Sequence, residues 1–428
     1  MRWSSWYRLL SYSRSSLWVV PFFAIVFEQI AVRLTDRLNP LLGWTFYGLG
    51  VGGTQGVLDA VITMTLSFIV FTFGSLLVAI QVASGQLTPR IIATTLLRND
   101  VVRYTVGLFV FTLLYGMGMR ARTEVAVNEL GMALSAVFAL GCIVAFLFLI
   151  DYAARLLRPV AIVTQVGEAG LRVIETVYPR ELAKSRRGQE PVALPSQPHQ
   201  TVFHQGKSGI VLAVNLDELV AEAQRTDCIV EFVAYVGDFV GVDEPLYQIY
   251  GAETVDEARL RSAVAFGSER TMDQDPMFSF RILVDIAIKA LSKAINDPTT
   301  AVLAIDQLHR LLRKVGRRHT RNEQLKDSTG TLRVVWRTPN WEDFVRLACV
   351  EIRTCGAENM QVARRLRAMI ENLIQTLPEH RHPALRLELD LLDRSIDRLY
   401  PFPEDAAAAR VADAQGLGGS GTSPREGP

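Results

Sequence analysis

Four long apolar runs dominate the first third of the chain, and the sequence after Asp151 is mixed. The runs cover residues 17–32, 57–83, 101–119 and 130–150. A helix needs about 20 mainly apolar residues to cross the hydrocarbon core of a bilayer, and it satisfies its own backbone hydrogen bonds there. The pattern therefore predicts an α-helical membrane domain with about four transmembrane helices over residues 1–158.

The first run is the weakest of the four, because it is short and contains Glu28. Its basic start at Arg2, Arg8 and Arg14, followed by apolar residues, is also typical of a signal peptide. No small-residue cleavage site follows, so we expect an uncleaved span. A carboxylate is costly in lipid and by default suggests function. We place Glu28 near the outer end of the run, which favours snorkelling to the surface over a functional role.

Basic residues in the short connections indicate the orientation of the spans. One side of the membrane holds most of the arginines near the spans: Arg2, Arg8, Arg14, Arg90, Arg98, Arg103, Arg155 and Arg158. The other side holds fewer, mixed with acidic residues: Arg33, Arg37, Arg120 and Arg122. This bias places both termini in the cytoplasm, which agrees with an even number of spans.

A polar and small-residue stripe runs along the second span. Its members are spaced four or seven residues apart and share one helix face: Thr63, Ser67, Gly74 and Gln81. Small residues let membrane helices approach closely, and hydroxyls can bond between helices. Helix packing is therefore the favoured interpretation, and a water-facing pore wall is the alternative. Both interpretations can hold together in an oligomer.

The region behind the spans predicts a soluble α+β region. We expect a helix and linker over residues 159–199, because the second half of this stretch is rich in Lys, Arg, Pro and Ser. Residues 200–252 alternate β-rich runs with turn residues. This stretch resembles the barrel-sandwich hybrid of biotinyl and lipoyl domains and of membrane-fusion adaptors. No lysine stands at a hairpin tip, so a swinging-arm cofactor is not supported.

Residues 253–402 predict a mainly helical bundle, and residues 403–428, rich in Ala, Gly and Ser, predict a disordered tail. Two helix starts carry an Asp cap followed by proline, at Asp275 and Asp297. The polar residues around these helices could form one site: Asp275, Arg281, Asp285, Asn296 and Asp297. Two capped helices with a surface ion-pair ladder are the favoured alternative.

Composition excludes several classes of protein. The net charge of +1 argues against a nucleic-acid partner. The four cysteines are scattered and the six histidines show no HExxH spacing, so neither a disulfide framework nor a metal site is expected. The chain contains no GxSxG, P-loop or Rossmann fingerprint. We therefore expect no enzyme, no catalytic residues and no cofactor.

Three segments carry a resemblance to a known family. They read SLLVAIQVASGQLTPRII, VGDFVGVDEPL and RTMDQDPMFSFRILVDIAIKALSKAINDPTTAVLAIDQL. In order and spacing they resemble the bacterial family of predicted membrane proteins known as domain of unknown function 2254, over roughly residues 8–400. The resemblance implies a multi-pass inner-membrane protein with a cytoplasmic C-terminal region, and it brings no catalytic residues.

Two functional hypotheses follow. The first is a homo-oligomeric channel or transport protein for ions or small solutes, because four spans are too few to enclose a roomy pathway in one chain. The stripe would line the pathway, and the cytoplasmic region would assemble the ring or sense a ligand. The alternative is a membrane-anchored scaffold or sensor that conducts nothing. The near absence of charge at the centres of the last three spans argues against a proton-coupled transporter.

Overall fold

A computed structural model describes residues 18–42, 48–86, 100–123, 128–156, 158–182, 194–251, 255–320 and 323–418, together with residues 3, 4, 6, 7, 13 and 16. Its contacts divide the chain into two compact units. The membrane unit consists of Ser11–Gly85 and Pro89–Ile162. The soluble unit consists of Met1–Leu10, Gln86–Thr88 and Val163–Pro428.

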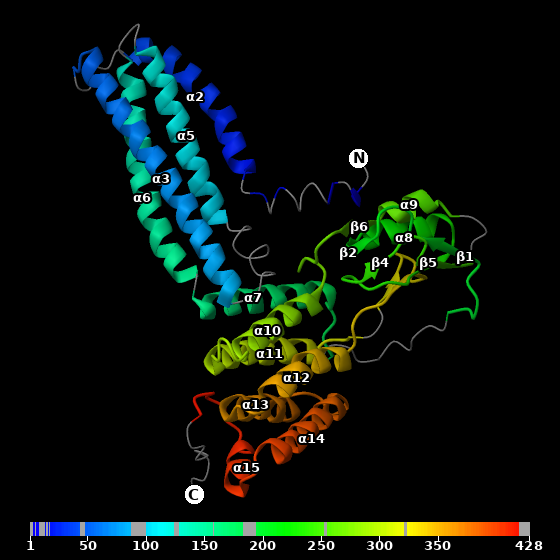
Figure 1. The fold of residues 1–428 in the computed structure, drawn as a ribbon. Coiled ribbons are helices and arrows are strands. Elements are labelled where there is room, and N and C mark those ends of the chain that lie inside the picture. Colours follow the sequence, from blue (N-terminus) through cyan, green and yellow to red (C-terminus); the bar gives the residue numbers. More distant parts are fainter. Residues whose placement is uncertain are drawn as a thin grey trace, which may run out of the picture. The chain divides into compact units, whose positions relative to one another are not determined.

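The described membrane unit is a bundle of α-helices (Figure 1). These are α2 (Val19–Leu42), α3 (Val51–Gln86), α5 (Asp100–Arg122) and α6 (Glu129–Leu156). Among the described residues, three helices are long and apolar enough to cross a membrane: α3, α5 and α6. The prediction of apolar spans is confirmed for these three. The helix that contains the first run, α2, also carries charged residues and does not reach the same hydropathy.

Glycines let α2 lie close along α5. A Cβ atom added to Gly107 would lie 2.6 Å from Cγ1 of Val20, and one added to Gly118 would lie 3.0 Å from Oε1 of Glu28. The two glycines are eleven residues apart, about three helical turns, so they share one face of α5. Close approach through small residues is the usual packing mode of membrane helices.

The face of α2 away from α5 is apolar and exposed. Its large side chains include Phe22, Phe23, Phe27, Ile30 and Leu34. A contiguous exposed apolar surface of this kind marks a contact with lipid or with another protein. One face of α2 therefore packs against α5, and the opposite face is suited to contact with lipid or with another protein.

The soluble unit contains two sheets. The larger one has the order β1-β5-β3-β8-β7, formed by Gln200–Phe203, Pro245–Tyr250, Ile229–Phe232, Leu332–Trp336 and Glu323–Lys326. The smaller one has the order β4-β2-β6, formed by Phe239–Val240, Gly209–Val214 and Val264–Gly267. Two short helices accompany them, α8 (Leu216–Arg225) and α9 (Glu257–Ser262).

The expected barrel-sandwich arrangement is wrong, because the described strands form two open sheets and no closed barrel. Strand β8 pairs in parallel with β3, with Val334 opposite Val230. Strand β6 pairs with β2 in the smaller sheet. Both β6 and β8 lie within residues 253–402, which were expected to be mainly helical with one further strand at 332–338, so the sheets do not end at residue 252.

Helices make up the rest of the soluble unit. In chain order they are α7 (Pro159–Val177), α10 (Pro276–Ala290), α11 (Pro298–Gly316), α12 (Trp341–Gly356), α13 (Met360–Thr376), the 3₁₀ turn Glu379–Arg381, α14 (His382–Leu399) and α15 (Pro403–Ala409). The α+β character of this region is confirmed. The linker predicted before residue 200 lies in part, at 183–193, outside the described residues.

The tail from residue 403 is ordered as far as residue 418, so the prediction of disorder is wrong there. Arg364 of α13 is buried, and its guanidinium donates to the carbonyl oxygens of Val411 and Gly418 at 3.0 and 3.1 Å. A buried charge without such acceptors would be costly. The Asp413 side chain accepts from the N–H groups of Gly416 and Gly418 and closes the turn. Residues 419–428 lie outside the described part.

The glycine contact between α2 and α5 generates a prediction. Gly107→Ala should lower the stability of the membrane unit by about 1–3 kcal/mol, because the added methyl group overpacks against the stiff side chain of Val20. Thermal unfolding of the purified protein in detergent, followed by circular dichroism, measures this. Gly141→Ala on α6 is the control, because a Cβ there meets nothing within 4 Å. Equal melting shifts in the two variants would contradict the packing argument.

Candidate functional site

Three consecutive residues before α10 each bond to a different part of the soluble unit. The Tyr7 hydroxyl donates to Oδ2 of Asp273 at 2.9 Å. The Gln274 amide accepts from Val214 N at 3.0 Å and donates to Val214 O at 3.4 Å. Asp275 accepts from Phe278 N at 3.1 Å and so caps α10. We call residues 273–275 the junction, and it lies within the segment RTMDQDP.

The junction is where the start of the chain meets the smaller sheet. Trp3 and Tyr7 stack with ring centroids 5.3 Å apart. Both pack against the core cluster of Leu212, Ala213 and Ala265 from β2 and β6. We call the described residues Trp3, Ser4, Trp6 and Tyr7 the N-terminal anchor. Burial of aromatic surface stabilises this contact, and the hydrogen bond from Tyr7 to Asp273 fixes the position of the tyrosine ring.

Asp275 is an unusual helix cap because it is almost fully buried, with 2 % of its surface exposed. Its Oδ2 atom has no hydrogen-bond partner among the described residues, and the nearest cation, Nη1 of Arg270, is 3.9 Å away. Burial raises the pKa of this carboxyl to about 6, and Arg270 offsets part of that rise. The site therefore holds a carboxyl that titrates close to neutral pH.

A glycine makes the close approach to Asp275 feasible. Gly237 has φ +97° and follows the strand β3 region in a tight turn. A Cβ atom there would lie 2.4 Å from Oδ2 of Asp275. Any other residue would be strained in this backbone conformation and would clash with the carboxylate.

The other residues expected to form a polar site are not brought together with Asp275. Arg281 pairs with Asp285 and also with Glu351 of α12. The Glu351 carboxylate has a lowered pKa, chiefly because Arg281 donates to it. Glu351 is the partner that sequence reasoning missed, since nothing in the spacing along α10 points to α12.

Asn296 and Asp297 lie beyond the far end of α10. Asn296 has φ +50° and occupies the turn, while Asp297 accepts from Thr300 N at 3.1 Å and caps α11. The fifteen residues of α10 span about 22 Å, so these residues are remote from Asp275. The expected cluster is thus three separate places: a buried cap, an ion-pair ladder and a capped turn.

All four stripe residues of α3 are exposed in the single chain: Thr63, Ser67, Gly74 and Gln81. The face that α3 buries contains Leu58, Val61, Thr65 and Ala79. At 3.6 residues per turn, the two faces point in opposite directions. The stripe therefore does not pack against the other described helices of its own chain.

Glu28 is buried against α5, with 4 % of its surface exposed. Gln29 Nε2 donates to its Oε2 atom at 2.7 Å. Further along α2, the hydroxyls of Thr35 and Tyr115 bond at 2.8 Å. The expectation that Glu28 snorkels to the surface is not met, because its side chain lies in the helix interface.

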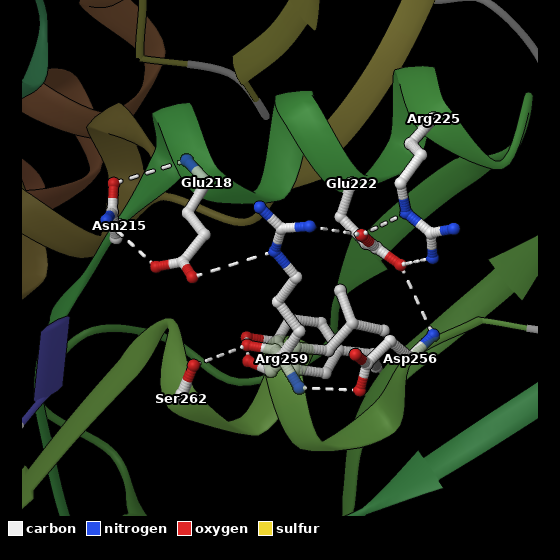
Figure 2. A network of polar contacts seen from close by, with 9 residues as sticks. Asn215, Glu218, Glu222, Arg225, Asp256, Arg259 and Ser262 are labelled. Carbon is white, nitrogen blue, oxygen red and sulfur yellow. Dashed lines mark hydrogen bonds and ion pairs between the residues drawn. The ribbon is translucent and has the colours of Figure 1, made fainter. Parts of the chain in front are cut away.

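A second buried acid, Glu222, joins α8 to α9 (Figure 2). Arg225 binds both of its carboxylate oxygens, at 2.9 and 2.6 Å, and the Asp256 N–H donates to it at 3.2 Å. Arg259 lies 3.5 Å from it. These donors, Arg225 first, lower the pKa of Glu222. Both carboxylate oxygens of Glu222 have donors, so this network stabilises the contact between α8 and α9. The sequence contained no pattern that predicted it.

No group of three His, Cys, Asp or Glu side chains that could hold a metal ion occurs in the part of the chain that the structure describes. The four cysteines are free, and only Cys355 is exposed.

Comparison with known proteins gives one family and a small set of relatives. The family model described as "Predicted membrane protein (DUF2254)" matches residues 14–372. The relatives include "Uncharacterized protein Rv1290c" of Mycobacterium tuberculosis (strain ATCC 25618 / H37Rv) and "Uncharacterized protein Mb1321c" of Mycobacterium bovis. Each is 24% identical over 430 residues, covering 95% of this chain and 81% of the relative. No solved structure is significantly similar to the chain.

The raised pKa of Asp275 generates a pH prediction. Because its folded-state pKa of about 6 exceeds the ordinary value of 3.8, the native state loses stability as pH rises from about 4 to about 6. Asp275→Asn keeps an oxygen for the cap and removes the ionisation. The variant should therefore gain stability over wild type across this window, by up to about 3 kcal/mol, and keep the gain above pH 6. The melting temperatures of wild type and variant between pH 4 and 8 measure this difference in stability. A difference that does not change with pH would contradict the raised pKa of Asp275.

Asp297 provides the matched comparison, because it caps a helix without the same burial. Asp297→Ala should cost about 1 kcal/mol, the usual loss for a helix N-cap. Thermal unfolding of the same preparation measures it. An Asp297→Ala variant that melts like wild type but loses a measured activity would instead indicate a functional role for this turn.

Proposed function

The chain belongs to the DUF2254 family of predicted membrane proteins, and from that premise we propose a four-span, homo-oligomeric channel or transport protein of the bacterial inner membrane. Its permeant species are ions or small solutes, and both termini lie in the cytoplasm. The observation that carries the topology is the N-terminal anchor. The observation that carries the assembly is the exposed stripe on α3.

The anchor constrains the number of membrane crossings. Trp3 and Tyr7, which precede α2, pack against residues that follow α6, so both stretches belong to one side of the membrane. A chain that returns to its starting side crosses an even number of times. The three apolar helices α3, α5 and α6 make an odd number, so a shared side for both stretches supports a fourth crossing.

Helix α2 is the segment available for that crossing. Its 24 residues span about 36 Å, which exceeds the roughly 30 Å of the hydrocarbon core. Its outer face is apolar, and Glu28 and Thr35 face α5 instead of lipid. The excess of arginines around the inner connections supports a cytoplasmic location for the termini.

The stripe supports assembly of several copies. Gly74 leaves open space where a Cβ would be, and Ser67 directs its hydroxyl to the carbonyl oxygen of Thr63 at 2.8 Å. Small residues with internally bonded hydroxyls suit a helix contact, and the exposed amide of Gln81 needs a polar partner or water. Since this face is not covered within the chain, the proposed partners are the same faces of neighbouring copies around a central pathway.

The rival function is a membrane-anchored sensor or scaffold that conducts nothing. The contact between the anchor and the junction favours a sensing role, because a segment that precedes α2 in the chain takes part in the soluble unit. The two functions differ in whether the α3 stripe reaches water.

Topology is tested by labelling thiols in intact cells with a membrane-impermeant reagent. Four crossings predict that a cysteine at exposed Trp6 and the native Cys355 are both protected, while Gly50→Cys reacts as the outer control. With α2 outside the membrane, the N-terminal position would react while Cys355 stayed protected. That result would remove both the fourth span and the anchor's role.

Assembly and conduction are tested at the stripe, in a background with Cys142→Ala and Cys355→Ser. Ser67→Cys should form a disulfide-linked dimer on oxidation, and Gln81→Cys should react with an impermeant thiol reagent, because thiolates form in water and not in hydrocarbon. Leu66→Cys and Ile80→Cys share the depth of these positions but lie about 100° around the helix. Cross-linking without labelling would favour the anchored sensor. Equal reaction at all four positions would contradict a specific face.

A further inference from the structure

The smaller sheet borders a cavity of about 470 Å³ that none of the contacts above use. Four segments line it: Ser4 of the N-terminal anchor, the loop from His204 to Gly209, Arg261 of α9, and β6 with the residue after it (Val264, Phe266, Gly267 and Ser268). Pockets of 300–1,000 Å³ are the usual size for small-molecule ligands. The cavity thus has the size of a ligand site and includes a residue from the anchor.

The lining is cationic and rich in hydrogen-bond donors. It contains Lys207 and Arg261 and no carboxylate among its described residues. No described residue forms a hydrogen bond or an ion pair with the Lys207 ammonium group. The hydroxyl-bearing residues Ser208 and Ser268 also line the cavity.

The loop that carries Lys207 is held in a fixed shape. Gly206 has φ +137°, a conformation that favours glycine, and the ring of His204 bonds to the carbonyl oxygen of Lys207 at 3.1 Å. That ring is buried and lies 4.3 Å from the ring of Phe266. Among described residues, none accepts a hydrogen bond from the backbone N–H groups of Gly206, Lys207 or Ser208. Consecutive free N–H groups beside a lysine are a common setting for a phosphate group.

Two contacts hold the guanidinium group of Arg261 in place at the cavity. Its Nε donates to Phe203 O at 2.9 Å, and its Nη2 pairs with Glu257 at 2.5 Å. These contacts neutralise part of its charge, so Lys207 carries most of the uncompensated charge of the cavity. A ligand with one phosphate group and a planar or apolar part against Phe266 would match this distribution.

We propose that this cavity binds the phosphate group of a phosphorylated small molecule of about mononucleotide size. The phosphate lies at the loop from Gly206 to Ser208, and the organic part fills the volume beside Phe266. Because Ser4 forms part of the wall, an occupied cavity contacts the segment that leads into α2. Two sources can present this chemistry, a soluble phosphomonoester and the headgroup of an anionic phospholipid.

The test uses the full chain in nanodiscs of phosphatidylcholine, with Gln205→Cys as a reporter on the exposed lining. Native Cys355, exposed and outside the cavity, is the internal control. We expect AMP, and inorganic phosphate more weakly, to slow maleimide labelling of the introduced thiol and to leave Cys355 unchanged. Protection by phosphatidylglycerol in the nanodisc, without protection by AMP, would support the same site and identify the lipid headgroup as its occupant.

Charge variants decide whether the loop is the site. Lys207→Ala should raise the concentration of AMP or phosphatidylglycerol needed for half-protection about tenfold or more, the usual effect of losing a charged hydrogen bond. Lys293→Ala removes an exposed lysine from the turn after α10 and should change nothing. Absence of protection by all three probes, or protection that Lys207→Ala leaves intact, would overturn the proposal. Labelling is measured without transport, so either result leaves the four-span topology to its own test.

Discussion

The packing of Trp3 and Tyr7 on the smaller sheet is the contact on which the organisation of this protein depends. It places the start of the chain in the same compact unit as residues that follow the membrane helices. Along the chain, both ends of the membrane unit therefore lead into the soluble unit. Burial of apolar surface stabilises this contact, and the hydrogen bond from Tyr7 to Asp273 fixes its position on the sheet. The proposed even number of crossings, with α2 as one of the spans, rests on this contact.

The pattern of apolar residues was enough to predict the three clear spans, since a helix in lipid needs little beyond length and hydropathy. It also predicted a span at residues 17–32, which the hydropathy of α2 does not confirm. The polar side chains of α2 find partners on α5 that the pattern does not indicate: Thr35 bonds to Tyr115, and Asp36 pairs with Arg122. The helix starts at Asp275 and Asp297 were also predictable, because an N-cap is decided within four residues. Contacts that join remote segments were not. Two examples are the pairing of β8 with β3 and the ion pair of Arg281 with Glu351. In neither case does the sequence near one partner indicate the other.

Buried charge explains why the prediction of a disordered tail was wrong as far as residue 418. The run ARRLR in α13 is typical of an exposed helix face, yet Arg364, Arg365 and Arg367 are all buried. Each guanidinium obtains acceptors from another segment: Arg365 pairs with Asp306, Arg367 with Asp393, and Arg364 with two carbonyl groups of the tail. A tail of Ala, Gly and Ser has little apolar surface of its own to bury. It is ordered because its backbone satisfies an arginine that the helix cannot leave unpaired.

The same reasoning bears on Glu28. If α2 crosses the membrane, this carboxyl stands about 14 Å from the helix start, inside the bundle. Its described partner is Gln29, a neutral donor, and a Cβ atom added to Gly118 would lie 3.0 Å from its Oε1 atom. A buried polar group is tolerated when it has a hydrogen-bond partner, and Gln29 supplies one here. Further along α2, Thr35 bonds to Tyr115 and Asp36 pairs with Arg122 of α5. The polar side chains on this face therefore hold α2 against α5, and the apolar face of α2 is left for contact with lipid or with another protein.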